Sequence, residues 1–109
     1  MSRTLKFLPE AVKDLKSLAG NERILVVKAI NKVLQNPVSV YEDGYGKPLG
    51  NKGGNNLSGF LKIKLRSAGI RVVYKLIKTE TEMLIIVIGA RADEEVYDTA
   101  KHRAEKNSV

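Results

Sequence analysis

The chain has 109 residues, 43% of them hydrophobic, which suits one compact domain with a real core and leaves little room for a large internal pocket. It carries 19 Lys and Arg against 12 Asp and Glu, a formal net charge of +7, and its pI is about 9.7. This excess indicates a polyanionic partner, such as nucleic acid, an anionic membrane or an acidic protein, although a merely soluble basic domain has the same composition.

Several classes of chemistry are disfavoured by what the sequence lacks. There is no cysteine, which excludes disulfides and thiolate chemistry, and the single His102 argues against a protein-only zinc site. The N-terminus has no apolar run typical of a signal peptide, and the longest apolar stretch, Met83–Ile88, is far too short to span a bilayer. We therefore expect a cytoplasmic protein with no metal, no small-molecule cofactor and no membrane contact.

The first third of the chain predicts a strand followed by a helical hairpin. Alternation within residues 4–8 predicts the strand, and Pro9 suits the first turn of a helix that ends by Gly20. Asn21 is the expected cap of a second helix, which ends before Pro37. The side chains expected to face the core are Val12, Leu15, Leu18 and Ala19 in the first helix and Ile24, Val27, Ile30 and Leu34 in the second.

Residues 38–59 contain six glycines among Asn, Lys and Asp, and they are expected to form an unusually long loop. We interpret 44–59 as a flexible Gly-rich loop, with a functional flap as the alternative. No Gly-Lys-Ser/Thr precedes a helix here, so the glycines do not form a phosphate-binding loop. Lys47, within this segment, is a candidate phosphate contact.

The second half of the chain predicts three strands and a helix. Residues 60–66 and 70–77 alternate, whereas 83–89 are almost wholly apolar, as in a strand buried on both faces. The last helix is expected to begin near Ala92 or Asp93. The whole chain, 1–109, is therefore expected to be a single α+β domain, with a small antiparallel sheet packed by an N-terminal helical hairpin and a short C-terminal helix.

Basic and apolar residues alternate along the predicted hairpin 61–76. Successive side chains of a strand point to opposite faces, so all the basic ones share one face. A two-residue turn at Ala68-Gly69 would pair Lys64 with Val73 and Lys62 with Lys75, whereas a slip of one residue would bury charges. The basic residues placed together in this way are Lys62, Lys64, Arg66, Arg71 and Lys75.

Five like charges on one face cost stability, and no acidic residue lies within the two strands to relieve them. A simple solvated face would mix the signs of its charges, so we predict an anion site for a phosphate backbone or an acidic protein segment. Arg91, beyond the last strand, and Tyr97, early in the last helix, are further candidates. On spacing alone, Arg91 is equally well an exposed strand-end residue and Tyr97 a core aromatic.

The sequence offers no Ser-His-Asp arrangement, no pair of histidines and no carboxylate cluster for a metal. Cleavage of RNA does not strictly require them, because its own 2′-hydroxyl can attack the neighbouring phosphate while Lys and Arg stabilise the developing charge. Crowded cations lower the pKa of Lys and Tyr from their usual values of about 10. A metal-free ribonuclease built from Lys, Arg and Tyr, dependent on help in positioning its substrate, fits these residues.

The stretch Leu61–Leu76, together with Val87-Ile88-Gly89-Ala90-Arg91 and Glu95-Val96-Tyr97, resembles RelE, the toxin family of bacterial type II toxin–antitoxin pairs. The resemblance extends over most of the chain. It implies a small sheet flanked by helices that enters the ribosomal A site and cleaves mRNA there. It also implies a cognate antitoxin that lays an acidic or amphipathic segment across the basic surface.

The resemblance implies a role for each matching position. Lys62 and Lys64 match two catalytic strand lysines, Arg71 the arginine that holds the scissile phosphate, and Arg91 one that assists the leaving group. Tyr97 matches a tyrosine that stacks on a substrate base and accepts a proton, so the general base is Lys62 or Tyr97.

Three basic residues complete the predicted surface. Arg66 matches a basic position that contacts RNA, and Lys75 and Lys47 are our additional RNA-binding candidates. The sequence departs from close relatives in its longer Gly-rich stretch and in Ala90 and Asp93, which replace positions that can be basic.

Two alternatives share the predicted fold. A ParE-like protein would bind DNA gyrase without nuclease activity, and an inactive homologue would bind only its antitoxin. The combination of Lys62, Lys64, Arg71, Arg91 and Tyr97 favours the nuclease, since an inhibitor needs no such set.

Overall fold

The computed structural model describes residues 3–52, 55–90 and 93–109, so Arg91 lies outside the described residues. The elements in chain order are β1 (Thr4–Phe7), α1 (Pro9–Lys16), α2 (Gly20–Leu34), the 3-10 helix η1 (Val40–Glu42), β2 (Lys47–Lys52), β3 (Asn55–Leu65), β4 (Ile70–Ile77), β5 (Glu82–Gly89) and α3 (Asp93–Lys106).

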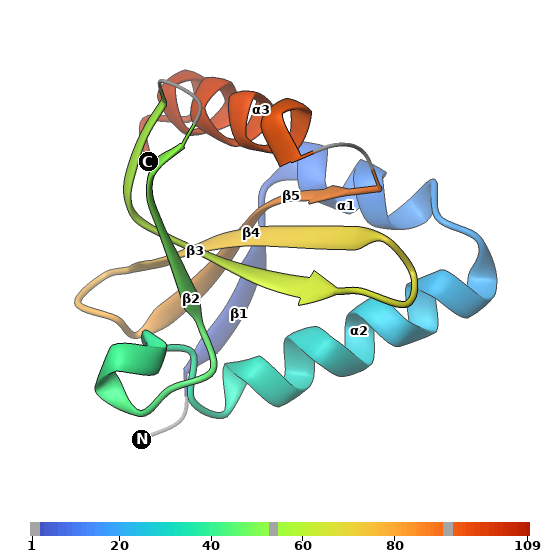
Figure 1. Ribbon diagram of the computed structural model, residues 1–109, viewed down its shortest axis with the longest axis horizontal. Coiled ribbons are helices and arrows are strands. Elements are labelled where there is room, and N and C mark those ends of the chain that lie inside the picture. The colour runs from blue at the N-terminus through green and yellow to red at the C-terminus, as the bar shows by residue number, and fades with distance from the viewer. Residues whose placement is uncertain (1–2, 53–54, 91–92) are drawn as a thin grey trace.

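The five strands form one sheet in the order β1-β5-β4-β3-β2. Figure 1 shows α2 along one side of this sheet, α3 across the other, and α1 beside β5, which it contacts. The α+β class, the helical hairpin and the C-terminal helix are therefore confirmed. The sheet is mixed rather than wholly antiparallel, because β1 pairs parallel with β5. A parallel pair needs a long crossover connection, and here the helical hairpin and three strands lie between the two partners.

The segment 44–59, expected as a flexible loop, is largely strand. β2 pairs antiparallel with the first half of β3, with Gly50 opposite Leu57. Leu57 is fully buried, so an apolar anchor holds the hairpin to the core. Gly50, at φ 63°, sits where the register shifts, and this left-handed conformation explains a glycine there. Gly50 and Gly59, two of the glycines that suggested a loop, thus belong to an irregular strand pair.

The buried stripe of α2 differs from the predicted one. Val26, Ile30 and Val33 face the sheet and are buried, whereas Ile24 is 58% and Val27 39% exposed. Apolar residues occupy two adjacent stripes of this helix, and both have helical spacing, so periodicity alone did not determine its rotation. Only Ile30 and Leu34 of the predicted stripe contact the core.

The start of α2 also differs from the expectation. Ala19 is the N-cap and is exposed, no side chain caps the helix, and Gly20 is its first residue. Asn21 lies inside the first turn rather than at the cap. Arg23 compensates by closing the hairpin, because its guanidinium donates to the carbonyl oxygens of Leu15, Lys16 and Leu18 at 3.1 to 3.3 Å.

The hairpin between β3 and β4 turns through four residues, 66–69, rather than two. Leu65 pairs with Ile70 and Lys64 with Arg71, which shifts the predicted register by two residues. The Gly69 N–H donates to the Arg66 carbonyl at 3.2 Å, and Gly69 has a φ of 66°. A shift of two preserves side-chain parity, so the predicted separation of basic and apolar faces survives.

Both faces of β5 are buried from Met83 to Ile88, as its apolar run predicted. On one face α3 approaches closely: a Cβ at Gly89 would lie 2.8 Å from Val96 Cγ2. On the opposite face of the sheet, the hydroxyl of Tyr74 in β4 donates to the Pro37 carbonyl at 2.7 Å and fixes the chain that follows α2. Within the described residues, no helix is long and apolar enough to cross a membrane.

Candidate functional site

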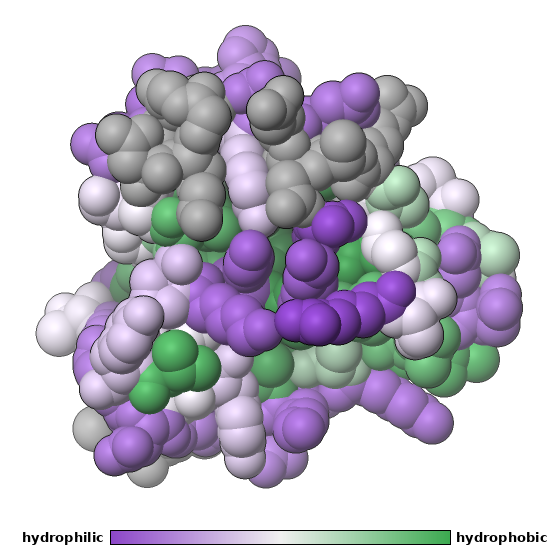
Figure 2. Space-filling model, viewed as in Figure 1, coloured by the Kyte–Doolittle hydropathy of each residue, from purple (hydrophilic) through white to green (hydrophobic). Residues whose placement is uncertain are grey.

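Cations from three adjacent strands and a turn meet on the α3 side of the sheet. Lys47 of β2 pairs with Lys62 of β3, and Lys64 of β3 pairs with Arg71 of β4. Directly paired residues point to the same face, and Arg66 follows in the turn. We call Lys47, Lys62, Lys64, Arg66 and Arg71 the basic cluster. Figure 2 shows strongly hydrophilic side chains gathered across the middle of this face, over β3 and β4.

Lys64 lies at the centre of the basic cluster, and the positive charge of every other member acts on it. Its pKa is held below the usual lysine value, first by the positive charge of Arg71, then by partial desolvation, and then by the charges of Lys62, Arg66 and Lys47. Each of these effects favours the neutral amine. The same repulsion, summed over the cluster, favours binding of a polyanion.

Lys62 connects the sheet to α3. Its Nζ donates to the Tyr97 hydroxyl at 3.1 Å and lies 5.7 Å from the centre of the Tyr97 ring. Tyr97 is only 4% exposed, so its ring belongs to the core and its hydroxyl is the group presented to the cluster. The interpretation of Tyr97 as a core aromatic is confirmed, and its polar end contacts the candidate catalytic Lys62.

No carboxylate of the described residues neutralises the lysines of the basic cluster. Among the described residues, Lys47, Lys62 and Lys64 form no ion pair with Asp or Glu, and neither β3 nor β4 contains an acidic residue. Within the described part of the chain, no group of three or more His, Cys, Asp or Glu is arranged to hold a metal ion. The arrangement can therefore attract phosphates, stabilise an oxyanion and exchange a proton through Lys64 or Tyr97.

Lys75 is separated from the basic cluster although it shares the same face. It pairs with Phe60 near the far end of β4, and its Nζ lies 5.1 Å from the Phe60 ring centre. The same Nζ donates to the carbonyl oxygen of Val109 at 2.8 Å, after the end of α3. Its contacts are those of a structural residue that holds the C-terminal segment on the sheet.

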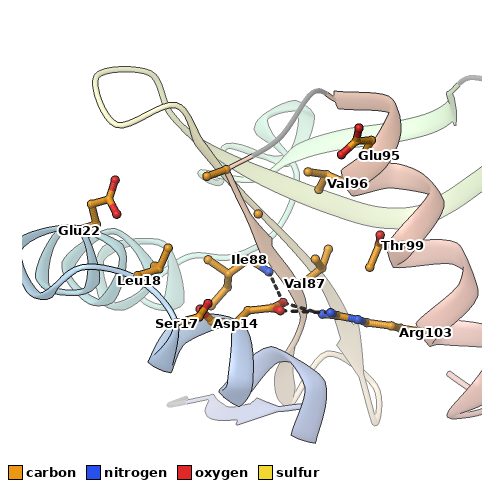
Figure 3. Close-up of a pocket in the computed structure, with 12 residues that line it drawn as sticks. Asp14, Ser17, Leu18, Glu22, Val87, Ile88, Glu95, Val96, Thr99 and Arg103 are labelled. Atoms are coloured by element: carbon orange, nitrogen blue, oxygen red, sulfur yellow. Dashed lines mark hydrogen bonds and ion pairs between the residues drawn. The ribbon is translucent and has the colours of Figure 1, made fainter.

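A second charged site lies along the free edge of β5, between α1, β5 and α3 (Figure 3). Arg103 donates to both carboxylate oxygens of Asp14, at 2.6 and 3.1 Å, and to the Ile86 carbonyl at 3.1 Å. Asp14 also accepts the Ile88 N–H at 3.0 Å. These two side chains satisfy backbone groups of β5 beyond the point where β1 ends. They border an open cavity of about 570 Å³.

Sequence reasoning did not find the Asp14–Arg103 pair or the Lys62–Tyr97 contact. The first pair is 89 residues apart and the second 35, and no motif spacing connects them. The pairing of Lys47 with Lys62 was equally hidden, because Lys47 was expected in a loop. Alternation along β3 and β4 was the one signal that identified most of the cluster.

Comparison with known proteins places the chain among bacterial toxins. No protein-family profile matches it. It is 31% identical over 103 residues to the mRNA interferase toxin RelE of Escherichia coli K12, with 94% of this chain and 98% of that protein aligned. The chain therefore belongs to the RelE family.

Solved structures agree with this assignment. A mutant of E. coli toxin RelE in complex with an antitoxin RelBc peptide aligns with a TM-score of 0.68 and 30% identity, over 92% of this chain and 95% of that one. The toxin–antitoxin complex RelBE2 of Mycobacterium tuberculosis aligns with a TM-score of 0.64 and 26% identity, over 85% and 95% of the two chains.

Proposed function

We propose that this protein is the toxin of a type II toxin–antitoxin system and cleaves mRNA in the ribosomal A site, in the cytoplasm. The observation that carries the proposal is the basic cluster, in which three lysines without carboxylate partners among the described residues lie together beside Arg66 and Arg71. Its E. coli relative is an mRNA interferase. The family has solved complexes with antitoxins, which supports a cognate antitoxin here as well.

The proposed reaction is an intramolecular transesterification. The RNA 2′-oxygen bonds to the adjacent phosphorus while the bond from phosphorus to the 5′-oxygen breaks, giving a 2′,3′-cyclic phosphate and a 5′-hydroxyl end. One group must take the 2′-proton, another must protonate the leaving oxygen, and cations must stabilise the phosphorane charge. The reaction gains most from correct alignment of the strand, which the ribosome would supply.

We assign the roles within the basic cluster by geometry and charge. Arg71 and Lys62 stabilise the scissile phosphate. Lys64, whose pKa is lowered chiefly by Arg71, is the lysine most readily available as a neutral base. Tyr97, which accepts a hydrogen bond from Lys62, is the alternative proton acceptor. Arg91, outside the described residues, keeps its proposed role at the leaving group.

The other cations are assigned to binding. Arg66 and Lys47 hold the RNA backbone on either side of the reacting phosphate. Both lie close enough to Lys64 for their charges to lower its pKa. Lys75 is excluded from this proposal by its contacts with Phe60 and Val109.

The test is codon-resolved cleavage of ribosome-bound mRNA by the purified protein, in parallel with a DNA gyrase supercoiling assay. We expect mRNA cut in the A site with 5′-hydroxyl ends and unaffected gyrase. Intact mRNA with inhibited gyrase would establish the ParE-like alternative. Intact mRNA with active gyrase, in a protein that binds its antitoxin, would establish an inactive homologue.

A further inference from the structure

The loop between α2 and β2, residues 38–46, exposes aromatic and apolar side chains. Tyr41 is 88% exposed, Tyr45 49% and Val40 44%. Exposed apolar groups that lie together on a small protein, rimmed by polar residues, are typical of interaction sites. Figure 1 shows the loop beside the start of β2 and the end of α2.

This loop is held in one conformation by its own hydrogen bonds. The Ser39 hydroxyl accepts from the Tyr41 N–H at 3.0 Å, and the Ser39 carbonyl accepts from Glu42 and Gly44 at 2.8 and 2.9 Å. The Val40 N–H donates to the Gly46 carbonyl at 2.7 Å. The rings are thus presented by a fixed backbone, which lowers the entropy lost when a partner binds.

The loop continues directly into the basic cluster. Tyr45 precedes Lys47 by two residues, so their Cα atoms are at most about 7 Å apart. Lys32 of α2 lies with its Nζ 5.5 Å from the Tyr45 centroid. Lys47, Tyr45 and Lys32 therefore follow one another from the basic cluster past β2 to α2. Tyr41 lies further along the same loop.

We propose that Tyr41 and Tyr45 form a stacking site for unpaired bases of the same RNA strand that occupies the basic cluster. This inference rests on the proposed function. Proteins hold single-stranded RNA with a positive groove for the backbone and aromatic rings for the bases, and each stack is tolerant of sequence. Lys47 and Lys32 hold the phosphates of this segment, and the two rings hold its bases.

The acidic residues of the loop agree with bases rather than phosphates at its tip. Glu42 and Asp43 are exposed next to Tyr41, and they disfavour phosphate there. They disfavour an acidic protein segment for the same reason. The bases of a strand that has left the cluster are the part of the RNA that suits an aromatic ring beside two carboxylates.

The experiment compares two RNAs in which every ribose is 2′-O-methylated, so that the 2′-oxygen cannot attack. One is a trinucleotide, which covers only the basic cluster, and the other an octanucleotide, which also reaches the loop. Binding at low salt is measured by fluorescence anisotropy for the wild-type protein and for Tyr41→Ala, Tyr41→Phe, Tyr45→Ala and Val40→Ala.

We expect Tyr41→Ala and Tyr45→Ala each to weaken octanucleotide binding by about tenfold, as loss of one base stack does, and to leave trinucleotide binding unchanged. Tyr41→Phe keeps the ring and should bind as the wild type does, and Val40→Ala is the matched control for a change in the same loop. Unaltered octanucleotide binding by both alanine variants overturns the inference.

Failure of the inference and failure of the proposed function are distinguished by Lys64→Ala. If Lys64→Ala weakens both RNAs while the tyrosine variants weaken neither, the cluster binds RNA and the stacking site is wrong. If the tyrosine variants weaken both RNAs equally, the rings do not lie outside the cluster and the inference is also wrong. A wild-type protein that binds neither RNA contradicts the stacking site, whereas the proposed function is overturned only by intact mRNA in the ribosome-dependent cleavage assay.

Discussion

Arg103 and Lys64 are two basic residues in opposite electrostatic surroundings. Arg103 makes a forked pair with Asp14 and a further bond to the Ile86 carbonyl. Arg71 has Lys64 as its cross-strand partner and is the largest cause of the lowered Lys64 pKa. Arg103 is paired with a carboxylate that orders the end of β5, whereas Lys64 is surrounded by further cations.

The comparison shows how a basic residue that stabilises the fold can be distinguished from one that binds an anionic partner. Arg103 and Lys64 are both positively charged and both of intermediate exposure, so neither charge nor burial distinguishes them. What differs is whether neighbouring charges attract or repel. Attraction at Arg103 stabilises the fold by itself, whereas the repulsion around Lys64 is unfavourable in the isolated protein and is relieved when an anionic partner binds.

The largest effect is expected from Arg71→Ala. Loss of one group that stabilises the transition-state charge should lower mRNA cleavage on ribosomes by about 10²- to 10³-fold. Growth arrest should be relieved at equal expression, with an unchanged thermal unfolding midpoint. Lys78→Ala is the control, because Lys78 is exposed and paired with Glu82 at 3.0 Å away from the cluster. An Arg71→Ala protein that remains as toxic as the control would show that the site is misplaced.

A smaller effect, and on stability rather than cleavage, is expected from Arg103→Ala. Loss of the charged hydrogen bonds to Asp14 should lower the free energy of unfolding by about 2 kcal/mol in urea titrations. Cleavage per folded molecule should be unchanged. The double variant Asp14→Ala/Arg103→Ala should lose less than the sum of the two single losses, because the two groups interact directly. Additive losses would mean that the pair contributes nothing beyond its separate backbone contacts.

The smallest effect concerns the protonation of Lys64. Arg71→Gln removes the first cause of the lowered pKa, so the Lys64 pKa should rise toward the ordinary lysine value. At a given pH, less of the neutral amine would then be present. An NMR titration of the lysine Nζ groups measures the shift, with Lys78→Gln as the control. A Lys64 pKa that does not move would remove the electrostatic basis for Lys64 as the base.

Much of the basic cluster could be predicted from the sequence because strand parity is robust. The turn of four residues rather than two shifted the register, yet Lys62, Lys64 and Arg71 stayed on one face. Lys75 shows the limit of that argument. It has the correct parity but lies at the far end of β4, and parity gives the face of a residue without its position along the sheet.

Other features depended on long-range packing that local pattern does not encode. The rotation of α2, which buries Val26 and exposes Ile24, was decided by contact with the sheet. The pairing of β2 with β3 was masked by glycines, and the burial of Leu57 is visible only in the folded chain. The Lys62–Tyr97 contact likewise needs α3 to be placed on the sheet.

The most direct test of the basic cluster is the salt dependence of binding to ribosomes that carry a 2′-O-methylated mRNA, measured by sedimentation for the wild type and for Lys47→Gln/Arg66→Gln. Each phosphate contact contributes about 0.7 to 0.9 to the slope of log affinity against log salt. We predict a steep slope for the wild type and a slope lower by about 1.5 for the double variant. Equal slopes for the two proteins would contradict the claim that this cluster grips the RNA backbone.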